Sequence, residues 1–282
     1  MLFRNRCHRV RKRLLLISLC LILLESCNPK NKNKEELTSN TENKTVQGDA
    51  RKMGQIVLDK CIAAHGNFDT WNRFKGLEYI LNDNGKEVYQ ITNLKNRKTY
   101  IKSKDYEVGF DGNVAWAKPD ATKVSGQSAA FYYNLDFYFI GIPYLLKDPG
   151  VHVDYKGSVL IGDRTYESLK ITFGADVGFT PNDVYFAYLD SNSYQLQILT
   201  YSISYFSGNS STVNTAKVYS DWINVQGIRM PGKMENFVWE NGKLGASKNH
   251  IRYLKDIKFL EEIKDPSIFD VAEGAIIEKI SK

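Results

Sequence analysis

The feature that most constrains the fold is a series of short β-forming segments that begins at Gly76 and recurs about every ten residues. Their side chains approach the two-residue alternation of half-buried strands, and turn-forming pairs such as Asn84-Gly85 and Asn241-Gly242 stand between them. The segments are Gly76–Leu81, Glu87–Ile91, Arg97–Ile101, Val151–Tyr155, Ser168–Phe173, Val184–Leu189, Tyr201–Tyr205 and Glu235–Trp239.

Helical patterns do not alternate with these segments, so the sequence predicts an antiparallel meander rather than βαβ units. We expect about ten or eleven strands, which is more than a twisted open sheet holds without curling. The predicted fold class is mainly β with a few helices. It consists of a single strongly curved antiparallel sheet, a half-barrel, with helices covering its concave face.

One amphipathic helix is predicted before the strands, over Met53–His65, with Gly66 as its C-terminal stop. Cys61 and His65 are four residues apart and would be neighbours on this helix. A thiol beside an imidazole can act as a nucleophile. However, Cys61 lies in the apolar stripe and His65 in the last turn, so packing is the favoured interpretation.

A second helical pattern is unusually aromatic, with six aromatic residues between positions 131 and 139. Gly141 and Pro143 interrupt it, which predicts a helix, a kink and a second short turn over Pro143–Lys147. The segment is either a permanent core filler or a lid over an apolar ligand cavity, and a third alternative places it on a membrane surface. The candidate lid residues are Phe131, Leu135, Phe139, Ile142 and Leu146.

The N-terminus has the layout of a secretory signal peptide, expected over residues 1–26. Six basic residues between Arg4 and Arg13 precede the apolar run Leu14–Leu24. As a helix this run would reach only about 16 Å, too short for a hydrocarbon core of about 30 Å.

The end of this segment, Leu24-Glu25-Ser26-Cys27, resembles the lipobox of bacterial lipoproteins, although Glu25 is unusual there. By that resemblance Cys27 is lipidated, for example by palmitate, and becomes the mature N-terminus. The alternatives are an uncleaved anchor or a plain secretory signal. Asn28, rather than an acidic residue, implies sorting to the outer membrane, where we expect the periplasmic face.

Residues 27–50 contain few apolar side chains and are expected to be a flexible tether, followed by one domain over residues 51–282. Six of the 38 basic residues and one of the 32 acidic residues lie in the first 26 positions. The rest of the chain is therefore close to neutral, and a nucleic-acid partner is not expected. Cys61 remains as a single cysteine in the domain, so we expect no disulfide framework.

No catalytic motif stands out in the sequence. It contains no G-x-S-x-G, H-E-x-x-H, Walker A or G-x-G-x-x-G pattern. His65, His152 and His250 lack ligand spacing, so we expect no metal site, no cofactor and no catalytic residue.

Several motifs together resemble a family of uncharacterised Gram-negative lipoproteins. They are Ala64-His65-Gly66 with Trp71, Phe110-Asp111-Gly112 with Trp116, Phe137–Tyr144 with Asp148-Pro149-Gly150, Val225–Pro231 and Pro266–Asp270. That family is similar in organisation to the lipoprotein-localisation half-barrels of the LolA/LolB-like superfamily. The resemblance implies a curved sheet that shelters acyl chains, with a lipid or lipoprotein as ligand.

Three functions follow as hypotheses. The first is a lipoprotein, tethered to the membrane through its lipid anchor, that binds a lipid, an acyl chain or another apolar ligand. The second is a structural or assembly-factor lipoprotein with a permanently filled core. The third is an envelope enzyme, for which the sequence offers the least support.

Overall fold

The computed structural model describes residues 32–174, 182–205 and 212–280. The predicted signal peptide and Cys27 lie outside these residues. The chain divides into two compact units, Met1–Asn43 and Lys44–Lys282. The second unit contains the strands of the described residues and the buried core described below. Among the described residues, no helix is long and apolar enough to cross a membrane.

The first helix is longer than its apolar pattern predicts. This helix, α1, extends over Lys32–Ala64, which confirms the helix expected from Met53 but also includes residues 32–50. We expected no regular structure there, because we judged the segment by its lack of apolar side chains. Apolar content decides whether a helix packs, whereas Lys and Glu are good helix formers even without packing. The role of this segment as a tether stays a prediction.

The remaining helices are short. They are α2 (Phe68–Arg73), η1 (Ser125–Gln127), α3 (Ala129–Tyr132), α4 (Leu135–Gly141), η2 (Tyr144–Lys147) and η3 (Pro266–Phe269).

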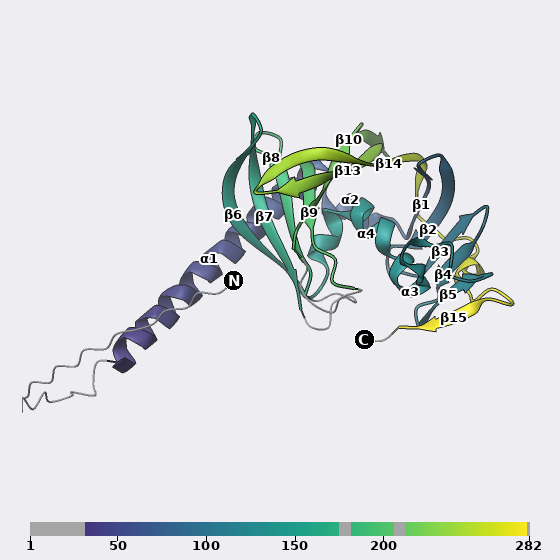
Figure 1. Ribbon diagram of the computed structural model, residues 1–282, viewed down its shortest axis with the longest axis horizontal. Coiled ribbons are helices and arrows are strands. Elements are labelled where there is room, and N and C mark those ends of the chain that lie inside the picture. Colours follow the sequence, from purple (N-terminus) through teal and green to yellow (C-terminus); the bar gives the residue numbers. More distant parts are fainter. Residues whose placement is uncertain (1–31, 175–181, 206–211, 281–282) are drawn as a thin grey trace, which may run out of the picture. The chain divides into compact units, whose positions relative to one another are not determined.

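The strands form one large antiparallel sheet with the order β15-β5-β4-β3-β2-β1-β14-β13-β10-β9-β8-β7-β6 (Figure 1). This confirms a mainly β protein built on an antiparallel sheet. The sheet is open, because β15 and β6 each have one strand neighbour among the described residues. The strands are β1 (Gly76–Asp83), β2 (Lys86–Asn93), β3 (Thr99–Ser103), β4 (Glu107–Phe110), β5 (Val114–Lys118), β6 (Val151–Ile161), β7 (Arg164–Phe173), β8 (Val184–Asp190), β9 (Leu196–Tyr201), β10 (Thr215–Ser220), β13 (Lys233–Glu240), β14 (Lys243–Leu260) and β15 (Ile276–Lys279). A separate hairpin consists of β11 (Ile223–Val225) and β12 (Ile228–Met230).

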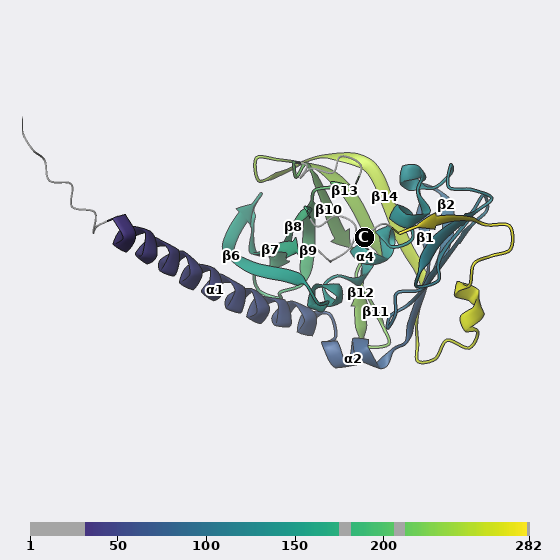
Figure 2. The same ribbon diagram turned by 90° about the horizontal axis from the view of Figure 1, so that it is seen from below.

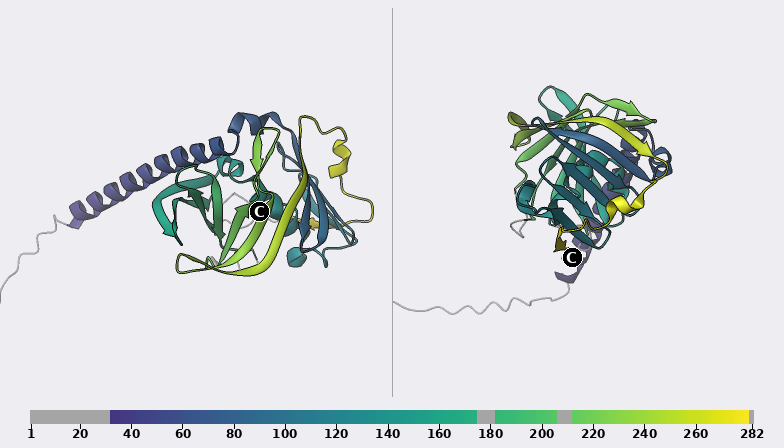
Figure 3. Two further views of the ribbon diagram at one scale, coloured as in Figure 1. Left: turned by 90° about the horizontal axis from the view of Figure 1, so that it is seen from above. Right: turned by 90° about the vertical axis from the view of Figure 1, so that its right-hand side faces the viewer.

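The long strand β14 joins the two halves of the sheet. Its first part pairs with β13 and its second part with β1, and both pairings contain register shifts. β1–β5 therefore lie on one side of β14 and β6–β10 lie on the other, beyond β13 (Figures 1 and 3). The segment with α3 and α4 lies between the two halves (Figures 1 and 2).

The predicted strand Tyr201–Tyr205 is wrong, although its alternation is the cleanest in the sequence. β9 ends at Tyr201. Ser202 and Ser204 are buried and bond to the neighbouring chain around Asp183: the Asp183 carboxylate accepts from the Ser204 amide at 2.7 Å, and Ser202 Oγ accepts from the Val184 amide at 2.9 Å. The two serines therefore alternate with larger residues because both make buried hydrogen bonds near Asp183, and not because they lie on the solvent face of a strand.

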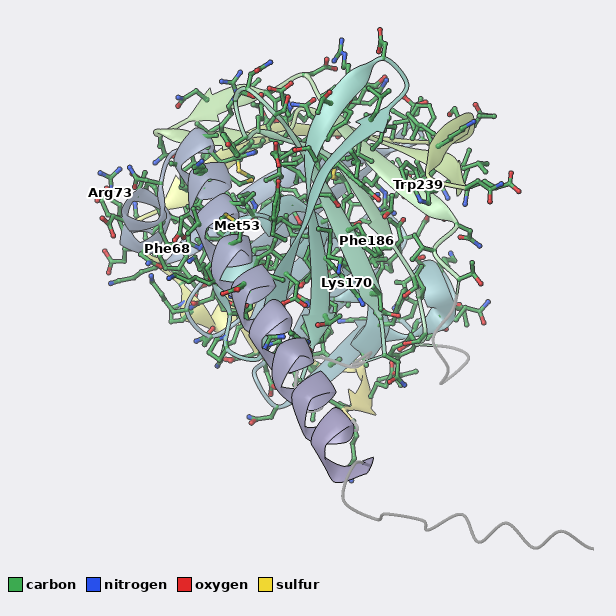
Figure 4. The ribbon with its side chains drawn as sticks, turned by 90° about the vertical axis from the view of Figure 1, so that its left-hand side faces the viewer. Met53, Phe68, Arg73, Lys170, Phe186 and Trp239 are labelled. Carbon is green, nitrogen blue, oxygen red and sulfur yellow. The ribbon has the colours of Figure 1, made fainter. Side chains whose placement is uncertain are left out.

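The half formed by β6–β10 is apolar on both faces. The main core lies on one face and includes Leu169, Ala187 and Leu199. A second cluster with Tyr188 and Trp239 lies on the other. Figure 4 shows the second face, where Phe186 and Trp239 are labelled.

Candidate functional site

The candidate site is built around residues 128–148, which we call the helical segment. Ser128 accepts a hydrogen bond from the Phe131 amide at 3.1 Å and so caps α3. α4 follows after Tyr133 and Asn134, and η2 confirms the predicted second turn. The single helix expected from position 131 is thus two helices. The segment is buried on several sides, so one apolar stripe at helical spacing does not describe it.

The predicted lid residues all lie in this segment, with different burial. Phe139, Ile142 and Leu146 are buried, whereas Phe131 and Leu135 are half-buried. Their role as a lid stays a prediction.

Polar anchors hold the first half of the helical segment to the sheet. Ser128 Oγ donates to Glu278 of β15 at 2.6 Å. Asp136 of α4 is paired with Arg252 of β14, and both side chains are almost completely buried. Tyr219 of β10 donates to the Phe139 carbonyl at 3.1 Å. These anchors come from both halves of the sheet.

Other anchors hold the end of the segment. Lys147 is paired with Asp59 of α1 at 2.5 Å. Arg97, in the turn between β2 and β3, donates to both carboxylate oxygens of Asp148 at 2.7 Å. The helical segment is therefore fixed at its two ends and in its middle by side chains.

Aromatic side chains fill the contact between α4 and the strands β8 and β9. The ring of Phe139 lies 4.9 Å from Tyr201 and is stacked at 6.5 Å on Tyr185. Tyr185 also meets Tyr138 of α4 at 6.0 Å and Phe173 of β7 at 5.3 Å. This contact has a predominantly apolar, aromatic surface.

A chain of buried and half-buried polar side chains borders this aromatic contact. Lys217 of β10 donates to Asn236 Oδ1 of β13 at 2.8 Å. Asn236 Nδ2 lies 2.9 Å from His250 Nδ1, and His250 Nε2 lies 3.2 Å from Asp83 Oδ1. Asp83 Oδ2 accepts from Arg252 at 3.2 Å. Arg252 in turn pairs with Asp136, so this chain of polar side chains reaches α4.

The polar chain combines a well-compensated charge with polar atoms, in it and beside it, that lack a partner among the described residues. Burial alone would raise the pKa of Asp83, but its bond to His250 and the charge of Arg252 outweigh burial and lower the pKa to about 2. Arg252 Nε and the Tyr79 hydroxyl are buried without a hydrogen-bond partner in the described part of the chain. Such groups are uncommon in native proteins, so each calls for a physical explanation.

A pocket of about 410 Å³ lies beside Asp83, in the middle of this series of polar side chains. At its inner side Tyr106 and Tyr132 of α3 share a hydrogen bond of 2.8 Å between their hydroxyl groups. The lining residues are Asp83, Lys86, Val88, Ser103, Asp105, Tyr106, Lys123, Ser125 and Tyr132. The pocket is polar, unlike the apolar cavity expected from the sequence, and it touches the helical segment through Tyr132.

The Cys61 and His65 side chains are both buried, as the packing interpretation predicted. Burial raises the pKa of the Cys61 thiol far above its usual range. His65 Nε2 accepts from the Leu196 amide at 3.1 Å, and Nδ1 donates to the Arg229 carbonyl at 3.2 Å. Burial lowers the pKa of His65 to about 4. Both ring nitrogens are thus occupied by the backbone, which leaves neither available to activate the thiol.

Sequence analysis missed the polar chain entirely. Lys217 lies between Ala216 and Val218, and in a strand with one buried face this pattern places the lysine in solvent. β10 is covered on both faces, so the lysine is buried instead. Asp136, an acidic residue within an aromatic run, was the one available signal. Across the described residues, no group of three or more His, Cys, Asp or Glu could hold a metal ion.

Solved structures from several bacteria align with this chain at low sequence identity. A LolA superfamily protein from Nitrosomonas europaea aligns with a TM-score of 0.47 and 10% identity, over 77% of this chain and 97% of that protein. A DUF1329 family protein from Desulfovibrio piger aligns with a TM-score of 0.46 and 9% identity, over 76% of this chain and 96% of that protein. A putative outer membrane lipoprotein-sorting protein domain from Vibrio parahaemolyticus aligns with a TM-score of 0.39 and 8% identity, over 71% of this chain and 93% of that protein. These matches include the superfamily that the sequence resembles.

No curated protein matches the chain at a significant level. The model of a protein family of unknown function, DUF6503, matches residues 12–222, which is well over half of the sequence. The chain therefore belongs to the DUF6503 family.

Proposed function

We propose that this protein is an outer-membrane lipoprotein, anchored through Cys27, that binds a lipid, an acyl chain or another apolar ligand on its periplasmic side. In this proposal the sheet curls around the helical segment, because thirteen antiparallel strands exceed what an open sheet carries flat. The helical segment acts as a lid, and the ligand lies between α4 and the aromatic surface of β8 and β9. The proposal assigns no catalytic role to any residue.

The observation that carries the proposal is the way α4 meets the sheet. Phe139 contacts Tyr185 and Tyr201 through their rings, and each polar anchor of the segment includes a side chain, from the Asp136–Arg252 pair to the Tyr219 hydroxyl on the Phe139 carbonyl. Movement of the segment would break these anchors but would leave the hydrogen-bond ladder between the strands intact. Its movement would uncover aromatic surface, which favours an apolar ligand.

The experiment measures uptake of a fluorescent fatty acid by the purified protein, together with native mass spectrometry of the same freshly purified protein. We expect saturable uptake or a copurified lipid. Phe139→Ala should weaken uptake, whereas Phe68→Ala, which changes a 37% exposed ring on α2, should not. A protein that is empty as purified and takes up no fatty acid would contradict the proposal.

A second candidate function is that of a structural or assembly-factor lipoprotein with a filled core. Phe137 is fully buried, and Ile140 and Leu146 are each 2% exposed, as in a permanent core. In this case Phe139→Ala should cost about 3–5 kcal/mol of unfolding free energy, as a core truncation does, with no ligand uptake by the parent protein. For a lid, the loss of stability should be smaller and the loss of ligand affinity should dominate.

A further inference from the structure

Lys217 is a buried cation with little compensation. Its residue exposure is 2%, and its ammonium group, which carries three donors, has Asn236 Oδ1 as its hydrogen-bond acceptor. Within the described residues, no carboxylate forms an ion pair with it. The ring of Phe139 lies 4.6 Å from Nζ and that of Tyr201 lies 6.0 Å away.

This arrangement is costly for a position that only has to fill space. Burial lowers the pKa of Lys217 to about 8, against the opposing charge of Asp83, so the side chain is still charged at neutral pH. An unpaired buried charge is unfavourable, and an apolar side chain of similar volume is usually as stable or more so. Groups whose pKa values are strongly shifted by burial and charge are found preferentially at functional sites.

The surroundings of the ammonium group indicate which ligand would do so. On one side lies the aromatic contact of Phe139, Tyr185 and Tyr201, which suits a hydrocarbon chain. The cation itself suits an acidic group, because a charge-assisted hydrogen bond is the strongest interaction that an ammonium can form. The two features together match a molecule with an acidic head and an apolar tail.

Phe139 connects this match to the helical segment. In the present conformation its ring occupies the side of Lys217 that faces α4 and provides a cation–π contact. Movement of α4 would remove the ring from the ammonium group. An acidic head group could then take its place while the chain covers the exposed aromatic surface.

We propose that Lys217 binds the acidic head group of a single-chain amphiphile that enters beneath the helical segment. This inference rests on the proposed function, since it needs a ligand between α4 and the sheet. The shared chemistry is an anionic oxygen group on a hydrocarbon chain, and its source is either a fatty-acid carboxylate or an alkyl phosphate.

The experiment compares three ligands with one chain length, decanoate, decyl phosphate and decanol, by calorimetric titration of the purified protein at pH 7. We expect at least one acid to bind about tenfold or more tightly than decanol. Lys217→Met should lose that preference and bind all three alike, and Lys217→Arg, which keeps the charge, should retain it. The acid that binds more tightly identifies the head group.

Lys170→Met is the matched control. The register across β7, β8, β9 and β10 places Lys170 with Phe186 and Ala216 on the face opposite Lys217 (Figure 4). This variant should keep the preference for acids. A preference that survives in Lys217→Met, or equal binding of all three ligands by the parent protein, overturns the inference and leaves the proposed function standing. Binding of none of the three contradicts both.

Discussion

His65 and Lys217 are both almost completely buried, with exposures of 1% and 2%, but their surroundings differ. His65 has a backbone partner at each ring nitrogen, its ring meets Trp222 edge-on at 4.8 Å, and its carbonyl accepts from Tyr144. Lys217 has one amide acceptor and two aromatic rings. The protein itself supplies the hydrogen-bond partners of His65, whereas it leaves the charge of Lys217 without a counter-ion among the described residues.

The difference separates structural burial from functional burial. A neutral group whose hydrogen bonds are all made by the protein stabilises a single packing arrangement. A charged group that lacks a counter-ion gains stability when a ligand supplies one. The pair most prominent in the sequence, Cys61 and His65, belongs to the first kind. The following variants test whether this distinction holds, beginning with the largest expected effect.

The largest effect is expected for Arg252, which belongs to the same polar chain as Lys217 but also anchors α4. Arg252→Met leaves the buried Asp136 carboxylate without a cation and should lower the free energy of unfolding by about 3–5 kcal/mol. Urea denaturation measures this loss. Arg73→Met is the control, because the Arg73 pair with Glu261 is exposed and should change stability by less than about 1 kcal/mol. Equal losses for the two variants would show that the Asp136 pair does not hold the helical segment.

A smaller loss is expected at His65. His65→Leu removes the partner of the Leu196 amide and of the Arg229 carbonyl, and should cost about 2–3 kcal/mol. The same variant should not change fatty-acid uptake. Loss of uptake with an intact fold would place His65 in the ligand site and break the comparison.

The pH dependence of stability gives an independent test of His65. Its pKa is about 4 in the folded protein and 6.5 when unperturbed. Between these values the unfolded state binds a proton that the folded state does not, so the contribution of His65 to stability falls as the pH drops from about 6.5 to about 4. The stability difference between the parent protein and His65→Leu should therefore shrink over this range, as followed by thermal unfolding. A constant difference would mean that His65 is not held neutral.

Much of the fold could be predicted because local patterns report it. The spacing of apolar residues predicts the helix from Met53 and most of the strands. Glycine and proline positions predict where these elements end and the turn over Tyr144–Lys147. The pairing of β15 with β5 could not be predicted, because it joins residues far apart in the sequence, and the exposed Ile276 and Ile277 give no clear pattern. Local patterns fail where long-range pairing decides the structure.

The site was less predictable than the fold for the same reason. The aromatic residues near position 139 indicate a buried segment. The sequence around Lys217, however, gives no sign that Asn236, His250 and Asp83 lie near it in the folded protein. Four strands have to align before these side chains meet. A lysine between two apolar residues looks like a solvent-facing position until both faces of its strand are known to be covered.

The smallest effect on stability at neutral pH is expected for Lys217→Met, because removing an uncompensated buried charge relieves its desolvation cost. The variant should be as stable as the parent protein at pH 7, or more stable. The pKa of Lys217 is about 8 in the folded state and 10.5 when unperturbed. Between these values the unfolded state binds more protons, so the parent protein should gain stability as the pH rises above 8, and the advantage of Lys217→Met should diminish.

Urea denaturation at pH 7, 8 and 9, with Lys170→Met as a parallel control, measures this convergence. Taking the difference between the proteins cancels the contributions of tyrosines that both share. A loss of several kcal/mol in Lys217→Met at pH 7 would show that the lysine is already compensated within the protein. The contrast with His65 would then disappear, because both buried groups would be structural.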